Sequence, residues 1–338
     1  MSLIRLPAEW EPQSFVQFTF PHRESDWADT YEEVLVCFIS LIHAVSQYQD
    51  VLVVCHNMRE VSQYFGDAAR ARIRLVELPS NDTWARDHGG ITVWQGDQLV
   101  VQNYFFNGWG LKFPAQHDNL LTGRLYEKGY FGKAALHTMD LVLEGGGLES
   151  DGQGTLLTTA DCLLSPNRNP HLSRIQIEDK LKQYLGVQRI LWLEHGYLAG
   201  DDTDSHIDTL ARFCDPQTIA YVQCTDPRDE HYEALTHMED ELRAFRTAQG
   251  QAYRLVPLPM PGVCLAADGH RLPATYANFL IINGAVLVPQ YQVPQDEAAL
   301  EQLQLCFPDR AVLGLDCRPL IEQHGSLHCV TMQYPKGL

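Results

Sequence analysis

The chain lacks several features by which large classes of protein are recognised. It has no run of about 20 apolar residues, which a membrane-spanning helix needs, and its opening stretch, MSLIRLPAEWEPQ, lacks the apolar core of a signal peptide. Basic residues are scarce: 25 Lys and Arg stand against 43 Asp and Glu, for a net charge of −18. Nucleic acid needs a basic footprint, so we expect no nucleic-acid partner. Because the apolar run is missing, we expect no membrane partner either. An acidic surface suits a cationic ligand, although solubility alone would also explain it.

Paired cysteines are missing as well. The nine cysteines are odd in number and scattered, without a CxxC pair. This excludes the simplest zinc sites and indicates reduced thiols, as in a cytoplasmic protein, rather than a disulfide framework. No linker, low-complexity tract or charge block divides the chain, whose length suits one large domain or two.

The sequence does contain an alternation of strand patterns with amphipathic helices. Helices are expected at residues 26–48, 173–187, 232–248 and 297–306. Strands are expected at residues 50–55, 72–79, 90–94, 98–106, 189–196, 206–214, 218–224, 310–316 and 326–333, and a hairpin that turns at Asn283-Gly284 is expected over 276–291. Because many strands have hairpin-length connections, the pattern indicates an α/β mixture that differs from a doubly wound sheet.

Two of four polar stretches contain glycine and acid together. In NDTWARDHGG, Arg86 and Asp87 are adjacent and would point opposite ways along an extended segment, although a surface loop with a salt-bridged Asp87 would look the same. In LEGGGLESDGQGT, three glycines follow Glu144, which allows close backbone approach or forms a bulge at a strand end. Neither stretch matches a phosphate-binding loop.

The other two stretches contain histidine. In AGDDTDSHIDTL, His206 and Asp208 stand two apart and would share one face of a strand, as an acid or base beside an anion. In GSLHCVT, His328 and Cys329 would face opposite sides of a strand, so His206 is the better candidate for the base of Cys329. A lone cysteine would also suit the core as a small hydrophobic residue.

Together these stretches supply one thiol, one imidazole and three carboxylates. Three acids around a thiol would raise its pKa and repel a developing oxyanion, which does not suit acyl transfer. They suit a substrate that is itself a cation. A guanidinium is planar and pairs bidentately with carboxylates, and its charge would stabilise the thiolate.

At this point the sequence resembles the agmatine deiminases, within the wider group of peptidylarginine-deiminase-like, guanidine-modifying enzymes. The motifs run in family order from residue 7 to residue 332: PAEWEP, NDTWARD, FFNGWG, LEGGGLESDGQGT, CLLSPNRNP, LKQYLGV, DDTDSHID, YANF and GSLHCVT. The resemblance implies one catalytic domain over residues 1–338 with the pentein fold, a five-bladed α/β propeller of pseudo-fivefold ββαβ units around a central site. The chain reads RDHGG, EGGGLESDGQGT and HGSLHC where relatives read RDTGP, EGGSIHVDGEGT and GGNIHC, which leaves the substrate tail open.

The resemblance also implies hydrolysis, without a cofactor or metal, of a small guanidine to a urea and ammonia. With agmatine the product would be N-carbamoylputrescine, as in putrescine biosynthesis. The resemblance implies that Cys329 is the nucleophile and that His206 is the general acid and base. It implies that Glu144 either contacts the guanidinium or orients His206. Binding of the guanidinium falls to Asp87 and Asp208, with Trp84 and Trp109 either capping the site or packing in the core.

Three alternatives stay open. Arginine or peptidyl-arginine as substrate would need a cation for its carboxylate, for which the candidates are Arg86, Lys112 and Arg168. A metal-dependent hydrolase would use Asp201, Asp202, Asp204, His206 and Asp208. A catalytically silent binding module is disfavoured because every expected catalytic residue type is present. The oligomeric state is a separate question, and both a monomer and a homo-oligomer suit the sequence.

Overall fold

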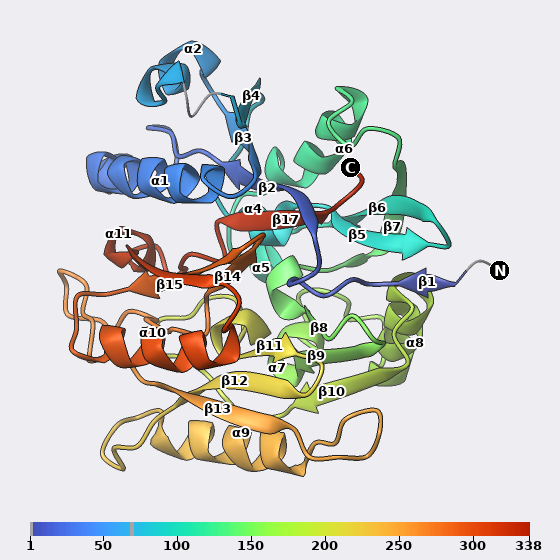
Figure 1. The fold of residues 1–338 in the computed structure, drawn as a ribbon, viewed down its shortest axis with the longest axis vertical. Coiled ribbons are helices and arrows are strands. Elements are labelled where there is room, and N and C mark those ends of the chain that lie inside the picture. Colours follow the sequence, from blue (N-terminus) through green and yellow to red (C-terminus); the bar gives the residue numbers. More distant parts are fainter. Residues whose placement is uncertain (1–2, 68–70) are drawn as a thin grey trace.

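The structure, a computed structural model, describes residues 3–67 and 71–338, so residues 1–2 and 68–70 of the expected 1–338 domain lie outside the described residues. Within the described residues the strands form five small sheets. The longer helices lie around the outside of the molecule, and the strands run between them and the centre (Figure 1).

Each sheet repeats one order of elements: two antiparallel strands, then a helix, then a third strand parallel to the second. Such a parallel connection needs a crossover, and the helix provides it. The five units are β5 (Ile91–Gln95), β6 (Gln98–Phe105), α6 (Asp118–Glu127), β7 (Ala135–Val142); β8 (Glu149–Ser150), β9 (Thr155–Thr159), α8 (Arg174–Leu185), β10 (Arg189–Leu193); β11 (Ala211–Asp215), β12 (Thr218–Gln223), α9 (Tyr232–Ala244), β13 (Arg254–Pro259); β14 (Leu280–Ile282), β15 (Ala285–Gln290), α10 (Gln295–Cys306), β16 (Ala311–Asp316); and β17 (Thr331–Pro335), β2 (Gln13–Thr19), α1 (Tyr31–Ser46), β3 (Asp50–Cys55).

The fifth unit joins the two ends of the chain. Its first strand is the C-terminal β17, which pairs antiparallel with β2 so that Thr331 lies opposite Phe18. Shorter elements complete the ring: β1 (Ile4–Arg5) pairs with β5, β4 (Ile73–Glu77) pairs with β3, and helical turns lie at α2 (Met58–Val61), α4 (Ala85–His88), α5 (Gly108–Leu111), α7 (Ala160–Leu163) and α11 (Arg318–Ile321). The mixed α/β fold is confirmed, and the five sheets with their repeated order of elements agree with the five-bladed propeller expected from the resemblance.

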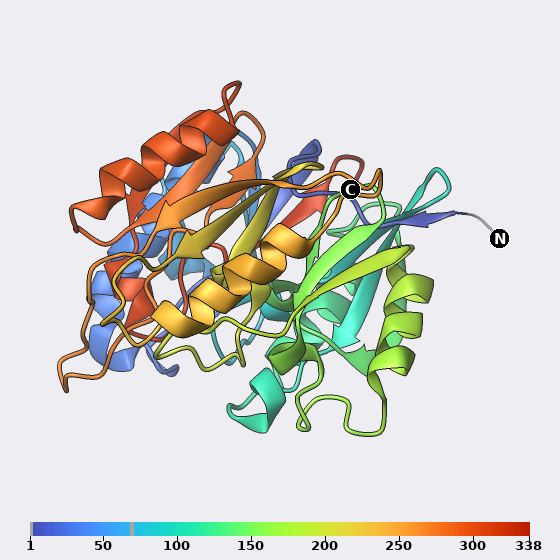
Figure 2. The same cartoon turned by 90° about the horizontal axis from the view of Figure 1, so that it is seen from below.

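Local sequence signals explain the elements that were predicted well. Helix α8 begins with a capping box between Ser173 and Gln176 and ends at Gly186, whose φ of 70° suits a glycine. The hairpin of β14 and β15 turns at Gly284, with a φ of 77°. The helices cover the outer faces of the sheets, as α8, α9 and α10 show when the molecule is seen from below (Figure 2). No described helix is long and apolar enough to cross a membrane.

Several predicted boundaries are wrong. The helix expected at 26–48 begins only at Tyr31, after a 3₁₀ turn, and the helix expected at 232–248 ends at Ala244 because Phe245 is extended. The strand expected at 206–214 begins with a 3₁₀ turn, Ile207–Thr209, and only becomes a strand at Ala211.

Two more segments that were expected to be extended are turns in the structure. The strand expected at 326–333 begins only at Thr331, which leaves His328 and Cys329 in a turn. Arg86 and Asp87 lie in the helical turn α4 rather than in an extended segment. The arguments from opposite and shared strand faces therefore do not apply, because these segments turn from one unit of the ring to the next.

Candidate active site

The connections that enter the five units each place one polar side chain at the centre of the ring. In every case the residue lies two to five positions before the first strand of its unit: Asp87 before β5, Glu144 before β8, Asp208 before β11, Asn278 before β14 and Cys329 before β17. All five are buried. The pseudo-fivefold fold thus brings together residues that are up to 242 positions apart in the chain, counting from Asp87 to Cys329.

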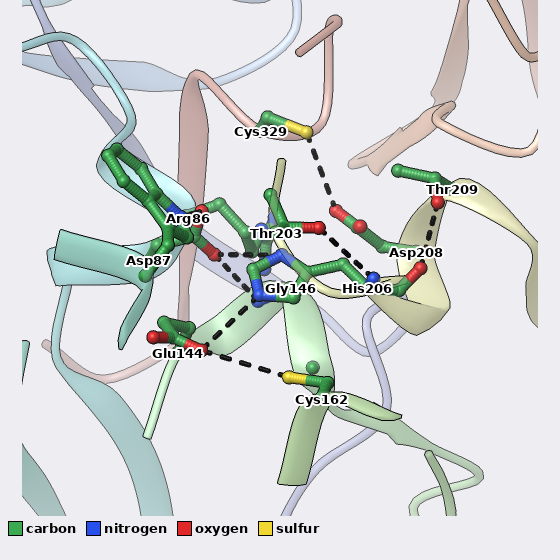
Figure 3. A network of polar contacts seen from close by, with 12 residues as sticks. Arg86, Asp87, Glu144, Gly146, Cys162, Thr203, His206, Asp208, Thr209 and Cys329 are labelled. Atoms are coloured by element: carbon green, nitrogen blue, oxygen red, sulfur yellow. Dashed lines mark hydrogen bonds and ion pairs between the residues drawn. The ribbon is translucent and has the colours of Figure 1, made fainter. Parts of the chain in front are cut away.

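The thiol of Cys329 lies between an amide and a carboxylate. Its Sγ is 3.4 Å from Oδ1 of Asn278, to which it donates, and 3.9 Å from Oδ2 of Asp208 (Figure 3). Burial raises the pKa of this thiol well above its ordinary value, and the charges of Asp208 and Asp87 raise it further. Cys329 is therefore a neutral thiol at pH 7.

His206 lies between two carboxylates. Its Nε2 is 3.3 Å from Oε2 of Glu144, and its Nδ1 is 3.6 Å from Oδ1 of Asp87 (Figure 3). Burial alone would lower the pKa of His206, but Asp87, Cys162 and Glu144 together hold it well above its ordinary value. The imidazole is therefore protonated at neutral pH and able to donate a proton.

Glu144 is held in turn by a buried arginine. Nε of Arg168 donates to both carboxylate oxygens of Glu144, at 3.0 and 2.8 Å, while Nη1 pairs with Asp204 at 2.5 Å. Burial would raise the pKa of Glu144, but the hydrogen bond with His206 and the charge of Arg168 bring it below its ordinary value. Glu144 is therefore an anion that fixes the orientation of His206.

The glycines after Glu144 have a spatial reason. A Cβ at Gly145 would lie 2.2 Å from the carbonyl oxygen of Arg86, and one at Gly146 would lie 2.5 Å from Nδ1 of His206 and 2.9 Å from Oδ1 of Asp87. The backbone N–H of Gly146 donates to that same Asp87 oxygen at 3.0 Å. Only glycine lets the backbone come this close to both side chains.

Asp87 also accepts a hydrogen bond from Trp109, whose Nε1 lies 3.0 Å from Oδ2. Burial raises the pKa of Asp87 to about 6, although the charge of His206 opposes the rise. Oδ1 of the neighbouring Asp208 is buried without any hydrogen-bond partner, and Nδ1 of His206 makes no hydrogen bond besides its ion-pair contact with Asp87. Buried polar atoms of this kind usually have partners, so these two mark where a ligand would bind.

A cavity leads from this centre, and we call it the catalytic cavity. It encloses about 380 Å³ with its open mouth, and it is lined by Asp26, Asp82, Trp84, Asp87, Trp109, Phe113, Asp202, Thr203, Gln323, His324, Gly325 and Cys329. Trp84 and Trp109 are buried and line it too, so they belong both to the core and to the site. None of the described residues that line it is Lys or Arg, and three acids besides Asp87 are present.

The sequence candidates fall into three groups. Cys329, His206, Glu144, Asp87 and Asp208 come together as expected. His328 does not contact the thiol of Cys329, because both of its ring nitrogens lie against carboxylates, Asp208 and Glu9, at 2.7 Å. The cations proposed for a substrate carboxylate are already paired or buried elsewhere: Arg168 with Glu144, Lys112 with Asp204 and Arg86 near Glu9.

The metal-hydrolase alternative loses its ligand set. Of its five candidate ligands, Asp201 hydrogen-bonds Thr203 and Ser205, while Asp204, His206 and Asp208 pair with different partners. Among the described residues one group could approach a metal, Glu144, Cys162 and His206, with donor atoms within 4.8 Å of one another. The guanidinium of Arg168 on Glu144 places a positive charge beside this group, which opposes cation binding.

Sequence reasoning missed Asn278 and Glu9, and it proposed Arg168 only as a cation for a substrate carboxylate. Asn278, in the YANF motif, accepts hydrogen bonds from the backbone N–H groups of His328 and Cys329 as well as from the thiol. Arg168 and Glu9 lie in the quoted motifs CLLSPNRNP and PAEWEP. The motifs signalled all three, but only the fold shows what each side chain contacts.

Solved structures define the class of protein. A Cys-to-Ser variant of the agmatine deiminase of C. jejuni, with its substrate bound, is 38% identical, with a TM-score of 0.93 over 99% of this chain and 97% of that chain. A Porphyromonas gingivalis protein provisionally assigned as an arginine deiminase is 54% identical, with a TM-score of 0.95 over 99% of both chains. The fold and the site together define a pentein of the guanidine-modifying kind.

Sequence comparison defines the family. The chain matches the Porphyromonas-type peptidyl-arginine deiminases over residues 5–335. The agmatine deiminase of Pseudomonas syringae pv. tomato is 35% identical, over 98% of this chain and 95% of that relative. The chain belongs to the Porphyromonas-type peptidyl-arginine deiminase family, in agreement with the resemblance seen in its motifs.

Proposed function

We propose that this protein hydrolyses agmatine to N-carbamoylputrescine and ammonia through a covalent intermediate on Cys329. The observation that carries the proposal is the charge pattern of the catalytic cavity, where Asp87 and Cys329 occur with Asp26, Asp82 and Asp202. Agmatine carries a guanidinium at one end and an ammonium at the other, so carboxylates along the whole cavity suit it.

Binding of the guanidinium prepares the nucleophile. Asp87 and Asp208 bind it from two sides, and the unpartnered Oδ1 of Asp208 accepts one of its N–H groups. The bound cation neutralises the two charges that raise the pKa of Cys329, so the thiol loses its proton to solvent only when substrate is present. The backbone N–H of Cys329 donates to Oδ1 of Asn278, and this bond holds the turn that carries the sulfur beside the guanidinium carbon.

The first half of the reaction releases ammonia. The thiolate of Cys329 attacks the guanidinium carbon and forms a C–S bond, with the electron pair moving to nitrogen. His206, protonated at rest, donates a proton to one terminal nitrogen through Nδ1, which makes no hydrogen bond to another residue. The C–N bond breaks, ammonia leaves, and an S-alkylthiouronium remains on Cys329.

The second half uses the neutral imidazole that results. His206 accepts a proton from a water molecule, and the hydroxide adds to the thiouronium carbon. The adduct then collapses: its hydroxyl group loses a proton to solvent, the C=O bond forms and the C–S bond breaks, which releases the ureido product and the thiolate. Glu144 stabilises the imidazolium in both halves by its contact with Nε2, while Trp84 and Trp109 exclude bulk water from the cavity.

Arginine deimination is the second candidate, supported by the provisional assignment of the P. gingivalis relative. The α-carboxylate of arginine would lie in a cavity with three further acids and no lysine or arginine among its described lining residues. Like charges repel in such an enclosed site, which costs affinity for arginine and favours agmatine.

Two broader inferences accompany this proposal. The whole chain, residues 1–338, acts as one catalytic domain, which is supported by the pairing of β17 with β2. The nine free thiols suit a reducing, cytoplasmic setting, and N-carbamoylputrescine would serve putrescine formation.

The test is a substrate panel with matched cysteine variants. We expect ammonia release from agmatine, with a kcat/KM at least roughly tenfold above that for arginine or arginyl peptides, the effect of about 1.4 kcal/mol of repulsion. Cys329→Ser should abolish turnover, whereas Cys264→Ser, at a half-buried thiol outside the site, should leave it intact. Arginine as the preferred substrate would overturn the substrate assignment, and an active Cys329→Ser variant would overturn the mechanism.

A further inference from the structure

His328, next to the nucleophile, lies between two carboxylates. Its Nδ1 is 2.7 Å from Oδ2 of Asp208, and its Nε2 is 2.7 Å from Oε2 of Glu9. The side chain is buried and is held by its backbone as well, since its N–H donates to Asn278 at 2.8 Å. A neutral imidazole carries only one N–H. Both contacts are therefore hydrogen bonds in two cases: either both ring nitrogens carry a proton, or one of the two carboxyl groups does.

The surrounding charges favour two ionised carboxylates. Burial would raise the pKa of both acids, but Arg212 and His328 bring that of Glu9 well below its ordinary value, and His328 brings that of Asp208 down too. Arg212 also donates to Glu9 at 2.9 Å and to Glu149 at 2.8 Å, and Arg86 lies 3.9 Å from Glu9. The ring of His328 therefore joins two buried carboxylates, with Nδ1 against Asp208 and Nε2 against Glu9.

This contact decides which oxygen of Asp208 remains available. Oδ2 is occupied by His328, whereas Oδ1 is buried and has no partner. His328 lines a second cavity, together with Glu9, Arg86 and Glu149. This cavity has a volume of about 680 Å³, including its open mouth. Cys329 lines the catalytic cavity instead.

We propose that His328 is a positioning residue that fixes Asp208 with Oδ1 directed at the substrate guanidinium. The inference rests on the proposed function and adds a residue that acts through Asp208 rather than on the reacting atoms. Without the contact at Oδ2 the carboxylate of Asp208 would be free to rotate, and Oδ2 would lose its ring partner next to Cys329.

Two amide substitutions separate the contacts of His328. In His328→Asn the amide nitrogen takes the place of Nδ1, so the hydrogen bond to Asp208 is kept and that to Glu9 is lost. In His328→Gln the amide nitrogen takes the place of Nε2, with the opposite result. Thr92→Val, which changes another residue of the second cavity, is the matched control.

The readout is the rate at which Cys329 is alkylated by chloroacetamidine, a planar cation, relative to chloroacetamide, its neutral analogue. A preference for the cation reports the binding of an amidinium by Asp87 and Asp208. We expect His328→Gln to reduce this preference by roughly tenfold or more, the effect of losing one hydrogen bond to a charged group. His328→Asn and Thr92→Val should keep it within about threefold of the parent.

The possible outcomes are distinct. Equal losses in the Asn and Gln variants would show a general structural role and overturn the proposal, and so would an unchanged preference in the Gln variant. A parent protein that reacts equally with both reagents would instead refute the proposed function, and this inference with it. Thermal melting of each variant shows whether any loss comes from unfolding.

Discussion

At the scale of single residues, Asp202 connects the charge of the catalytic cavity to pH. Burial and the neighbouring Asp201 raise the pKa of Asp202 to about 7, against the opposing charge of Lys112. Its carboxyl group is an anion above that pH and becomes neutral below it. If Asp202 binds the ammonium of agmatine, the KM should rise about tenfold as the pH falls from 8 to 6. The reason is that the ionised fraction of a carboxyl group with a pKa of about 7 falls about tenfold over this range.

Butylguanidine, which lacks the ammonium, serves as the control substrate. Its KM should not follow the titration of Asp202, and Asp202→Asn should raise the KM for agmatine while removing most of its pH dependence. Asp82 also lines the cavity, and burial raises its pKa to about 6. If the pH dependence persists in Asp202→Asn and disappears in Asp82→Asn, the ammonium is bound by Asp82, and the prediction for Asp202 is wrong.

A second prediction concerns Gly146. A methyl group there would overlap Nδ1 of His206 and Oδ1 of Asp87, at 2.5 and 2.9 Å, so one of these side chains must move. Gly146→Ala should reduce kcat by roughly 100-fold, the usual effect of displacing a catalytic group by about 1 Å. Gly123→Ala, in helix α6 with nothing within 4 Å of the new methyl, should leave kcat unchanged and stabilise the fold by about 0.5–1 kcal/mol. Equal kcat values in the two variants would contradict the close approach.

At the scale of elements, local signals determined how much could be predicted. Helix α8 was predicted well because its capping box and its terminal glycine are local in the sequence. The turns that contain His206 and Cys329 were predicted as strands because Ile207 and Leu327 are apolar and buried, as strand residues also are. Apolar patterns report burial, and these turns are buried at the centre of the ring.

Asn278 shows the same limit for the site. Its amide matters only because it faces the turn of His328 and Cys329, 50 and 51 residues further along. The acids and the thiol could be proposed from their chemistry, whereas an asparagine in YANF has no chemistry of its own to suggest a role. Knowledge of the five units would have predicted one polar residue before β14.

Arg168 supplies the prediction at this scale, because it joins the connection before β8 to the one before β11. It donates to Glu144, to Asp204 and to the carbonyl oxygen of Thr203, and its side chain is fully buried. Arg168→Gln leaves the buried carboxylate of Glu144 without its cation, which should cost about 3–5 kcal/mol of unfolding free energy. Denaturant unfolding measures this cost.

The matched control is an arginine on the surface. Arg243 is 62% exposed and pairs with Glu239 on the same helix, so Arg243→Gln should change the unfolding free energy by less than about 1 kcal/mol. A similar small effect in both variants would show that Arg168 does not hold the two connections together.

At the scale of the whole molecule, the ring is closed by the two ends of the chain. Strand β17 begins two residues after Cys329 and pairs with β2, so the position of Cys329 depends on this pairing. Sequence periodicity could not predict this pairing, because strands more than 300 residues apart carry no local signal of each other. The resemblance to a family of known fold implied a five-bladed propeller, but it named no strand pairing.

Tyr334 tests the closure. It is fully buried, its ring stacks on Phe15 at 4.7 Å, and its hydroxyl donates to Gln17 at 2.9 Å and accepts from the N–H of Gly90, which follows the turn of Asp87. One side chain thus joins β17, β2 and the connection before β5. Tyr334→Ala should cost about 3–5 kcal/mol of unfolding free energy, the usual cost of removing a buried aromatic ring.

Because β17 also positions Cys329, the loss of stability and the loss of reactivity should occur together. As denaturant rises, Tyr334→Ala should lose the preference of Cys329 for chloroacetamidine in the same transition in which its tryptophan fluorescence changes. Tyr126→Ala, at a partly exposed ring on α6, should keep both transitions near those of the parent protein. If the preference for the cation were lost well before the fluorescence changed, β17 would detach on its own, and the ring would not unfold as one cooperative unit.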